Sequence, residues 1–476
     1  MLESDADINV PLYVDLDGTL VRSDLLVESI MQLLRTNLFY VFLFPLWLCH
    51  GKAFFKQCIA DRTEIDVATL PYNKSFLEFL RHEFARGREL ILATAANRKF
   101  AEQVSAHIGI LKRVLASDDK TNMSSKTKLQ HIKKLSGERH FDYAGNAKAD
   151  LPIWQCARHA LIVSPEGGVQ EAVARSRVIT RLFDADKASW RTYMRALRLH
   201  QWSKNILIFI PVLAAHNFTF SALMEAVGAF LSFGLIASSV YLVNDLVDLP
   251  LDRTHPRKRR RPFASGAISA KKALVLVPGL IACGVAIALL VGTPFLLVLA
   301  LYSAITIAYS FRLKRVPIVD VMTLASLYTI RVLAGAAATM TVPSFWLLVF
   351  SMFIFLSLAL AKRSAELIAF PLADGVVSGR GYAVSDLQHI HGMGVASGYM
   401  AVLVAALYVN NPTVAALYDR PYMLWLICPI LLYWISRLWL KTGRGEMHDD
   451  PVVFAVTDRS SQIIAILVTI VVILAS

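Results

Sequence analysis

The chain has 476 residues, of which 55% are hydrophobic, and its mean hydropathy is +0.50. These values are too high for a fully soluble protein, so we expect much of the chain to lie in lipid. The formal net charge of +13 gathers in short loops between apolar runs, which argues against nucleic-acid binding and is typical of cytoplasmic membrane loops. The five cysteines have no metal-site or disulfide spacing, as expected in a reducing compartment.

The first third of the chain alternates predicted strands with predicted helices, which indicates an α/β domain with a parallel sheet. The predicted strands cover residues 10–14, 89–93, 140–144 and 159–163. Asp15 and Asp17 follow the first strand, and an open α/β sheet carries its chemistry at the carboxyl ends of its strands. Two acids one residue apart can serve as nucleophile and proton donor if their surroundings separate their pKa values. A polar stretch then predicts a domain boundary near residue 185, which gives domains 1–185 and 186–476.

The run Asp15-Leu16-Asp17-Gly18-Thr19 after a strand resembles the haloacid dehalogenase (HAD) superfamily of phosphatases, over about the first 165 residues. The resemblance implies a Rossmann-like fold in which Asp15 is the nucleophile and Asp17 the general acid or base. It also implies that Thr94 holds the transferring phosphate and that Lys128 neutralises charge, with Lys126 as the alternative. A degenerate domain that only anchors or regulates its partner is the other interpretation.

The same resemblance implies a Mg²⁺ site made by Asp15, Asp17, Asn146 and Asp150. Asn146 stands where the superfamily usually has an aspartate, so this site has one negative charge fewer. A helical cap is expected at about residues 21–75. Within it, the apolar stretch 37–48 is too short to span a bilayer, and it either rests on the membrane or the second domain or forms a buried cap helix.

Nine apolar runs follow a basic amphipathic segment at residues 190–201, which suits a helix at the membrane surface. The runs cover about 205–220, 222–243, 273–291, 294–310, 318–340, 345–361, 393–410, 421–440 and 460–475. Basic loops follow the even-numbered runs, so the positive-inside rule puts the N-terminus in the cytosol and the C-terminus outside. We therefore expect a multi-pass protein of the plasma (inner) membrane whose first domain and active sites face the cytoplasm.

An acidic motif closes the second apolar run. Its four oxygen-bearing side chains belong to Asn244, Asp245, Asp248 and Asp252. Residues four apart share one face of a helix, and carboxylates massed at a helix C-terminus oppose each other and the helix dipole. Mg²⁺ would remove that penalty and could hold a bound phosphate. The alternative is a solvated acidic loop paired with the basic run at 257–261.

This NDxxDxxxD motif resembles that of the UbiA superfamily of intramembrane prenyltransferases, over about residues 190–476. The resemblance implies an all-α bundle of nine transmembrane helices around a cavity that faces the cytoplasm. The usual second acidic motif is reduced to Asp320. The decaprenyl-phosphate phosphoribosyltransferase branch matches better, through residues 201–205, 244–248 with 255–259, Arg331 with 334–335, and 449–451.

In that branch the lipid is the acceptor, and the diphosphate belongs to phosphoribosyl pyrophosphate. The implied substrate-binding residues are Lys204, Asn205, Arg257, Lys258, Lys314, Asp320, Arg331, Lys362, Asp449 and Asp450. Asp248, a Mg²⁺ ligand, or Asp320 would also stabilise positive charge on the sugar in the transition state.

We therefore predict Mg²⁺-dependent transfer of 5-phosphoribosyl to a polyprenyl phosphate, followed by removal of the 5-phosphate by the first domain. A homo-oligomer is compatible with this sequence. The alternative is a conventional prenyltransferase that moves a polyprenyl group from its diphosphate to an aromatic acceptor. Its first domain would then be regulatory or would act on another phosphate.

Overall fold

The computed structural model describes residues 9–138, 140–176, 179–183, 188–369, 381–412, 418–447 and 451–475. Contacts divide the chain into two compact units: Met1–Leu197 with Tyr241–Pro278, and Arg198–Val240 with Gly279–Ser476. The division falls inside two helices, α11 (Phe220–Val247) and α13 (Ala270–Val291). The loop between these helices therefore groups with the first unit. The boundary predicted near residue 185 lies outside the described residues and stays a prediction.

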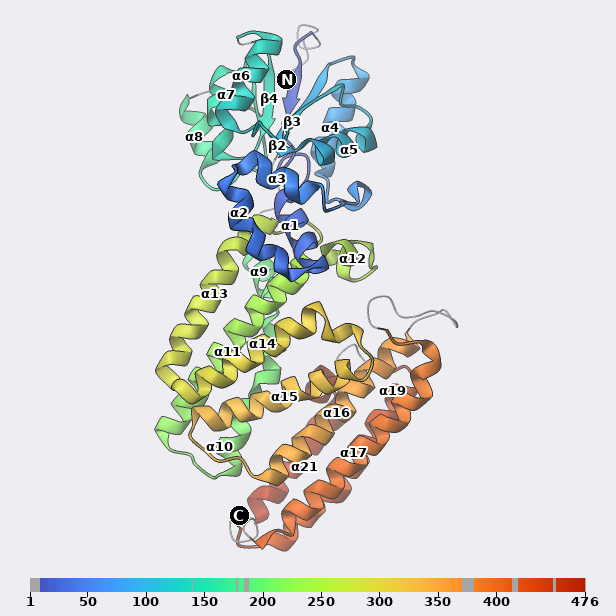
Figure 1. Ribbon diagram of the computed structural model, residues 1–476. Helices are drawn as coiled ribbons and strands as arrows, with labels where there is room; N and C mark the ends of the chain where they lie inside the picture. The colour runs from blue at the N-terminus through green and yellow to red at the C-terminus, as the bar shows by residue number, and fades with distance from the viewer. Residues whose placement is uncertain are drawn as a thin grey trace. The chain divides into compact units, whose positions relative to one another are not determined.

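The first unit contains a six-stranded sheet whose neighbouring strands are all parallel, in the order β3-β2-β1-β4-β5-β6 (Figure 1). The strands are β1 (Leu12–Val14), β2 (Leu90–Asn97), β3 (Arg113–Ser117), β4 (Asp142–Gly145), β5 (Ala160–Val163) and β6 (Ile179–Phe183). The sequence predicted β1, β2, β4 and β5 but missed the two edge strands. Edge strands bury less side-chain surface, so their apolar pattern is weaker.

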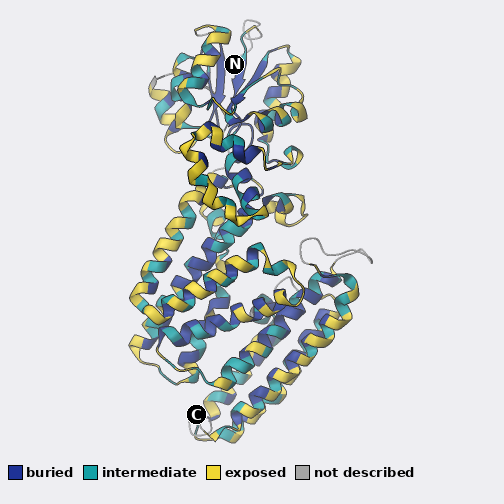
Figure 2. Cartoon of the chain, viewed as in Figure 1, coloured by how far each residue is buried: buried dark blue, intermediate teal, exposed yellow. Residues whose placement is uncertain are grey.

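Helices cover both faces of this sheet, because successive strand side chains point to opposite sides. Leu12 and Val14 join a core with α4 (Lys74–Ala85) and α5 (Arg98–Ile108). Tyr13 joins a second core on the other face. That core includes residues of α6 (Ser125–Ser136), α7 (Leu151–Cys156) and α8 (Val169–Ser176). Figure 2 shows the buried strands between helices with exposed outer faces.

The predicted cap is helical. It comprises α1 (Leu25–Thr36), η2 (Leu38–Leu43), α2 (Phe44–Cys49), α3 (Lys52–Ala60) and η3 (Val67–Thr69). Asp24 caps α1 by accepting a 2.9 Å hydrogen bond from the Val27 backbone N–H. In the apolar stretch, Trp47 is buried, but Phe39 and Phe42 are each 75% exposed. The interpretation of this stretch as a buried cap helix is therefore wrong, and the cap presents an apolar surface.

The remaining elements of the first unit are one short helix between β4 and β5, one helix after the sheet, and two helices in the segment between α11 and α13. They are η4 (Lys148–Asp150), α9 (Trp190–Ala196), α12 (Leu249–Thr254) and η6 (Lys258–Arg260).

The second unit is all-helical. Its elements beside parts of α11 and α13 are η5 (Leu199–Phe209), α10 (Ile210–Ala214), α14 (Thr293–Phe311), η7 (Leu313–Arg315), α15 (Val319–Ala338), α16 (Phe345–Ile368), η8 (Val384–Asp386), α17 (Leu387–Val409), η9 (Pro421–Leu426), α19 (Ile427–Gly443), α20 (Pro451–Thr457) and α21 (Arg459–Ala475). Buried side chains of α15, α16, α17 and α19 make one continuous hydrophobic core.

Seven helical segments of the described chain are long and apolar enough to cross a membrane. They correspond to the second to eighth predicted runs. The ninth run forms α21, a shorter apolar helix, and the first is divided between η5 and the five-residue α10. The expected count of nine spanning helices is thus not confirmed. The multi-pass character of the chain is confirmed.

Candidate active sites

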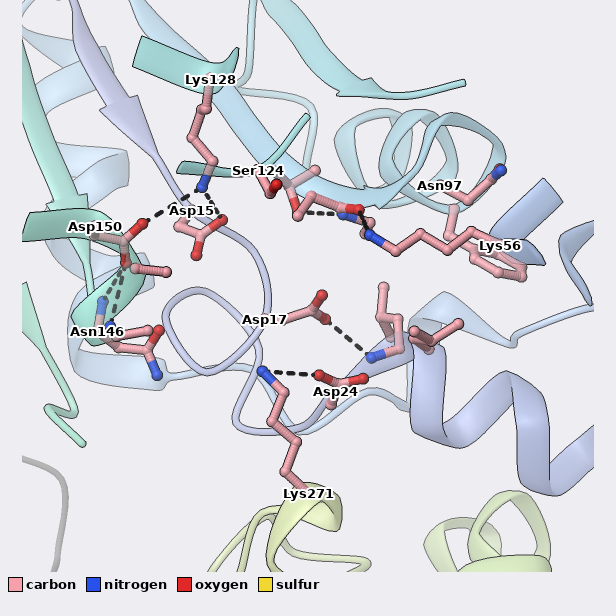
Figure 3. A pocket seen from close by; sticks show the side chains of 18 of the residues that line it. Asp15, Asp17, Asp24, Lys56, Asn97, Ser124, Lys128, Asn146, Asp150 and Lys271 are labelled. Atoms are coloured by element: carbon pink, nitrogen blue, oxygen red, sulfur yellow. Dashed lines mark hydrogen bonds and ion pairs between the residues drawn. The ribbon is translucent and has the colours of Figure 1, made fainter. Parts of the chain in front are cut away.

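The first candidate site lies at the carboxyl end of β1, the strand between β2 and β4 (Figure 3). The Lys128 ammonium donates a 2.9 Å hydrogen bond to Oδ1 of Asp15, and both side chains are nearly buried. Burial raises the pKa of Asp15, although Lys128 acts in the opposite direction. Burial likewise opposes the charge of Lys128, but Asp15 and Asp150 outweigh it and raise the pKa of that lysine. The predicted nucleophile therefore has a cation in direct contact.

A tyrosine that the sequence did not indicate connects this pair to the predicted metal loop. The Tyr143 hydroxyl accepts a 2.9 Å hydrogen bond from Lys128 and donates one of 2.8 Å to Oδ1 of Asp150. Lys128 also lies 3.6 Å from Asp150. Tyr143 is in β4, the strand beside β1, so the sheet places its hydroxyl next to the groups that follow β1. The sequence has no local signal that places Tyr143 at the site; only the order of the strands, with β4 beside β1, indicates it.

Asn146 lies after β4 and against the loop that follows β1. Its backbone N–H donates a 3.3 Å hydrogen bond to Asp150, and its side-chain oxygen accepts a 3.4 Å hydrogen bond from Thr19. A Cβ on Gly18 would lie 2.1 Å from the Asn146 side chain, and Gly18 has a φ of +78°. Both the space and the backbone angle therefore require glycine there.

Asp17 accepts a 2.9 Å hydrogen bond from the Leu25 backbone N–H. Burial and the neighbouring Asp24 carboxylate raise the pKa of Asp17 to about 8. A carboxyl group that keeps its proton near neutral pH can donate it to a leaving oxygen. The environment of Asp17 is thus suited to the predicted role of general acid.

These groups line a cavity of about 250 Å³. Thr94, from β2, is fully buried and lies at its wall. Two lysines that the sequence reasoning missed also line the cavity. Lys56 donates hydrogen bonds of 2.6 Å to the Ala95 carbonyl and 2.8 Å to Asn122. Lys271 comes from the first turn of α13, and its sequence context indicates only a basic loop.

The oxygens around this cavity fit a divalent cation. Asp15, Asp150 and Asn146 contribute carboxylate and amide oxygens, which Mg²⁺ prefers. Within the described residues, no group of three or more His, Cys, Asp and Glu side chains could hold a metal. Mg²⁺ here would therefore complete its shell with amide, phosphate and water oxygens.

The second candidate site is the acidic motif between α11 and α12, also in the first unit. Helical backbone hydrogen bonds continue through this motif. The Asp248 N–H donates to the backbone carbonyl of Asn244, and the Asp252 N–H donates to that of Asp248, both at 2.9 Å. Asp245 and Asp252 are buried, and Arg261 lies 3.1 Å and 2.7 Å from their carboxylates. Burial raises the pKa of Asp252, and Arg261 counteracts this effect.

The alternative interpretation, a solvated acidic loop paired with the basic run, is therefore correct about the pairing for Arg261. It is wrong about the solvation, because Asp245 and Asp252 are buried. Asp245 and Asp252 thus have Arg261 as their counter-charge, and a Mg²⁺ site at this motif stays a prediction. Asn244 and Asp248 are half-buried, whereas Arg257 and Lys258 are exposed at the surface. The sequence signal for Arg261 was present, because it belongs to the run 257–261.

A third cluster lies in the second unit and unites three predicted substrate-binding residues. Arg331 donates a 3.1 Å hydrogen bond to the side-chain oxygen of Asn205, and both residues are buried. The Lys204 ammonium lies 5.7 Å from the ring centre of Tyr328. The Arg331 guanidinium lies 5.2 to 5.4 Å from the ring centres of three aromatic residues. They are Phe233, Tyr302 and Tyr328.

A glycine makes this cluster possible. A Cβ on Gly335 would lie 1.9 Å from the carbonyl oxygen of Ile208, so only glycine lets η5 pack directly on α15. Because η5 contains Lys204 and Asn205 and α15 contains Arg331, this close approach brings the three side chains together.

The remaining predicted substrate-binding residues of the second unit are not among the described contacts of the cluster around Arg331. Asp320 is fully buried, 2.7 Å from the Arg363 guanidinium, and accepts a 2.8 Å hydrogen bond from Tyr309. Lys314 and Lys362 are half-buried in η7 and α16. Asp449 and Asp450 lie outside the described residues.

Helices long and apolar enough to span a membrane, a buried acidic motif at a helix end and a cluster of buried cations are the features of an integral membrane protein with polar sites. The chain belongs to the UbiA prenyltransferase family, which matches residues 206–458. It is a UbiA-type membrane transferase, and its first unit contains a six-stranded parallel sheet of the α/β class.

Two relatives illustrate the extent of the similarity. An uncharacterized protein of Sinorhizobium fredii, y4nM, is 36% identical over 97% of this chain and 90% of its own length. The decaprenyl-phosphate phosphoribosyltransferase of Mycobacterium tuberculosis is 37% identical over 179 residues. That match covers 37% of this chain and 59% of the mycobacterial protein.

Two solved structures show a limited similarity to the chain. A UbiA homolog from Archaeoglobus fulgidus, bound to GPP and Mg²⁺, covers 59% of this chain with 97% of its own, at 18% identity and a TM-score of 0.46. Phosphoserine phosphatase in its apo form covers 37% of this chain with 94% of its own, at 12% identity and a TM-score of 0.28.

Proposed function

We propose that this chain transfers the 5-phosphoribosyl group of phosphoribosyl pyrophosphate to a polyprenyl phosphate, and that its first unit then removes the 5-phosphate. The product would be a polyprenyl-phosphoryl ribose. We further propose that both reactions occur at the cytoplasmic side of the plasma (inner) membrane. There the soluble donor is available and the basic loops are expected.

The choice of donor is supported by the mycobacterial relative, whose name specifies phosphoribosyl transfer to decaprenyl phosphate. The environment of Asp320 also supports phosphoribosyl pyrophosphate as the donor. It stands where a second metal-binding motif would be needed for a prenyl diphosphate, but it is buried against Arg363. One acidic motif would therefore hold the metal, and it can serve a small soluble diphosphate.

In the transfer step, a phosphate oxygen of the lipid attacks ribose C1, and the bond from C1 to the diphosphate oxygen breaks. Asn244, Asp245, Asp248 and Asp252 would hold Mg²⁺, which when bound neutralises charge on the leaving diphosphate. Arg261, already beside two of these carboxylates, adds positive charge there. Lys204 and Arg331 remain predicted phosphate-binding residues.

In the hydrolysis step, Asp15 attacks the 5-phosphate phosphorus while Lys128 neutralises charge on the phosphoryl oxygens. Asp17 gives its proton to O5 of the ribose, which leaves as a hydroxyl group. Water then attacks the aspartyl phosphate, Asp17 takes the proton of that water, and inorganic phosphate departs. Mg²⁺ held by Asp15, Asn146 and Asp150 would supply further charge stabilisation.

The observation that carries the combined proposal is that one compact unit contains both the Asp15 cavity and the acidic motif. The test is to incubate the full chain with a polyprenyl phosphate, Mg²⁺ and phosphoribosyl pyrophosphate labelled in the ribose. A lipid-soluble label that lacks the 5-phosphate is expected, and Asp15→Asn should accumulate the phosphorylated form. Absence of lipid-soluble label would contradict the transfer step, and equal 5-phosphate in wild type and variant would contradict the hydrolysis step.

The family name favours one rival, a prenyltransferase that takes a polyprenyl diphosphate as donor. Competition separates the two, because an unlabelled prenyl diphosphate should not suppress labelling by phosphoribosyl pyrophosphate in our proposal. Strong suppression, together with prenyl transfer to an aromatic acceptor, would favour the rival.

A further inference from the structure

The cavity of the first candidate site includes a cation from outside the α/β fold. Lys271 lines this cavity, and its ammonium lies 3.0 Å from Oδ2 of Asp24. The Asp24 side chain is 8% exposed, whereas that of Lys271 is 52% exposed. The lysine is therefore anchored by a buried carboxylate but still open to a molecule that enters the cavity.

The position of Lys271 is fixed by the segment between α12 and α13. At one end, Arg253 donates two hydrogen bonds, of 2.8 Å and 2.5 Å, to the Glu28 carboxylate on α1. In the middle, a Cβ on Gly266 would lie 2.7 Å from Cβ of Arg22, so this loop packs closely on the loop before α1. At the other end, Ala270 and Ala273 are buried beside Lys271.

The cations that line the cavity occupy separate positions (Figure 3). Lys128 contacts Asp15, where the phosphoryl group would be transferred. Lys271 points toward Asp24, beyond Asp17 as seen from Asp15. Lys56 lies apart from both and donates its described hydrogen bonds to protein oxygens. One cavity is thus lined by a cation that contacts Asp15 and by a second cation that contacts Asp24.

We propose that Lys271 is a specificity-determining residue of the phosphatase cavity, which binds a second phosphate on the substrate, the phosphodiester at the far end of the sugar. The cavity would then select lipid-linked sugar phosphates over free sugar phosphates. This inference rests on the proposed phosphatase function, and it makes the transferase segment part of the phosphatase specificity.

The test compares three substrates with the purified full chain: ribose 5-phosphate, ribose 1,5-bisphosphate, and a short-chain alkyl phosphodiester of ribose 5-phosphate. Since a hydrogen bond to a charged group typically contributes a tenfold or larger effect, wild type should prefer the two-phosphate substrates by about tenfold in kcat/KM. Lys271→Gln should remove most of this preference through KM, and Lys271→Arg should retain it. Equal activity on the bisphosphate and the diester would show that the second phosphate is recognised without the alkyl chain.

The matched control is Lys272→Gln, since the neighbouring Lys272 donates a 2.9 Å hydrogen bond to the Tyr193 hydroxyl instead. This control should keep the wild-type preference. If Lys271→Gln lowers kcat/KM equally on all three substrates, its role is structural and the inference is wrong. An unchanged preference would also overturn it.

A binding measurement separates failure of the inference from failure of the phosphatase function. If wild type hydrolyses none of the substrates, the phosphatase proposal fails. The affinity for the alkyl diester can still be measured in Asp15→Asn with and without Lys271→Gln. An approximately tenfold weaker Kd in the double variant would support binding of the second phosphate, and equal Kd values would refute it.

Discussion

Arg253 and Glu28 are 225 positions apart in the sequence, yet their side chains form a bidentate ion pair with N–O distances of 2.8 Å and 2.5 Å. Both side chains are nearly buried, at 5% and 6% exposure. The pair joins α12 to the first cap helix, α1. A segment of the transferase sequence is thereby fastened to the α/β fold inside one compact unit.

Glu28→Gln should strongly destabilise this unit. It leaves the Arg253 guanidinium buried without its counter-charge, and breaking a buried pair typically costs about 3–5 kcal/mol. The measurement is the thermal transition of the full chain in detergent. Glu89→Gln is the control, because Glu89 pairs only at 3.5 and 3.7 Å with the exposed Arg113 and Lys112, and should change stability by about 1 kcal/mol or less. Equal transitions for the two variants would contradict a stabilising role.

Lys128→Ala should lower the phosphatase kcat by about 10²–10³-fold, the usual effect of removing one positioned electrostatic group. Phosphate release from ribose 5-phosphate measures it. Lys126→Ala is the matched control, since Lys126 is exposed and lies one half-turn away on α6. A large loss in Lys126→Ala with none in Lys128→Ala would reverse the assignment.

The phosphatase rate should fall as the pH rises through the pKa of Asp17, which burial and Asp24 raise to about 8. The acid can donate a proton below this pKa and cannot above it. Asp24→Asn removes the neighbouring negative charge and should move the alkaline limb of the pH–rate profile to lower pH. Asparagine still caps a helix well, so α1 should persist. Bound Mg²⁺ also lowers this pKa, so both profiles need one saturating Mg²⁺ concentration. An alkaline limb at the same or a higher pH in Asp24→Asn than in wild type would contradict the electrostatic coupling between Asp24 and Asp17.

Gly335→Ala should abolish most transferase activity, because the new Cβ would lie 1.9 Å from the Ile208 carbonyl and push η5 away from α15. Such overpacking typically costs about 1–3 kcal/mol and would separate Asn205 from Arg331. Label transfer to lipid and thermal stability are the measurements. Gly392→Ala in α17 should be tolerated, since nothing lies within 4 Å of its Cβ position. Normal activity in Gly335→Ala would show that the close contact is dispensable.

Arg261→Gln should make the stability of the chain depend more strongly on Mg²⁺. Without the guanidinium, the buried Asp245 and Asp252 carboxylates lose their counter-charge, and a bound cation could replace it. Thermal transitions with EDTA and with excess Mg²⁺ measure the difference. Arg260→Gln removes an exposed charge from the same run and should behave as wild type. An Arg261→Gln protein with no added response to Mg²⁺ would argue against a cation site at this motif.

Local patterns in the sequence were sufficient for the two fold classes and for many candidate residues. Alternation of strands and helices predicts the parallel sheet, and Asp15 follows β1 because active carboxylates of such sheets stand at strand ends. Apolar runs likewise predict the second to eighth helices, since a spanning helix needs about 20 apolar residues. The acidic motif, and Asn205 and Arg331 as separate candidate residues, were also within reach of motif reasoning, but the contact between Asn205 and Arg331 was not.

Only the tertiary structure decided which distant groups meet. Tyr143 joins Lys128 to Asp150 because β4 lies beside β1, and strand order is not encoded in any local period. Lys271 looked like one of many loop charges, which positive-inside topology alone explains. Its place in the phosphatase cavity depends on the packing of the segment between α12 and α13 against α1. The sequence alone thus determines most of the elements and the chemistry of the motifs, because both depend on local patterns, and long-range packing determines which charges share a site.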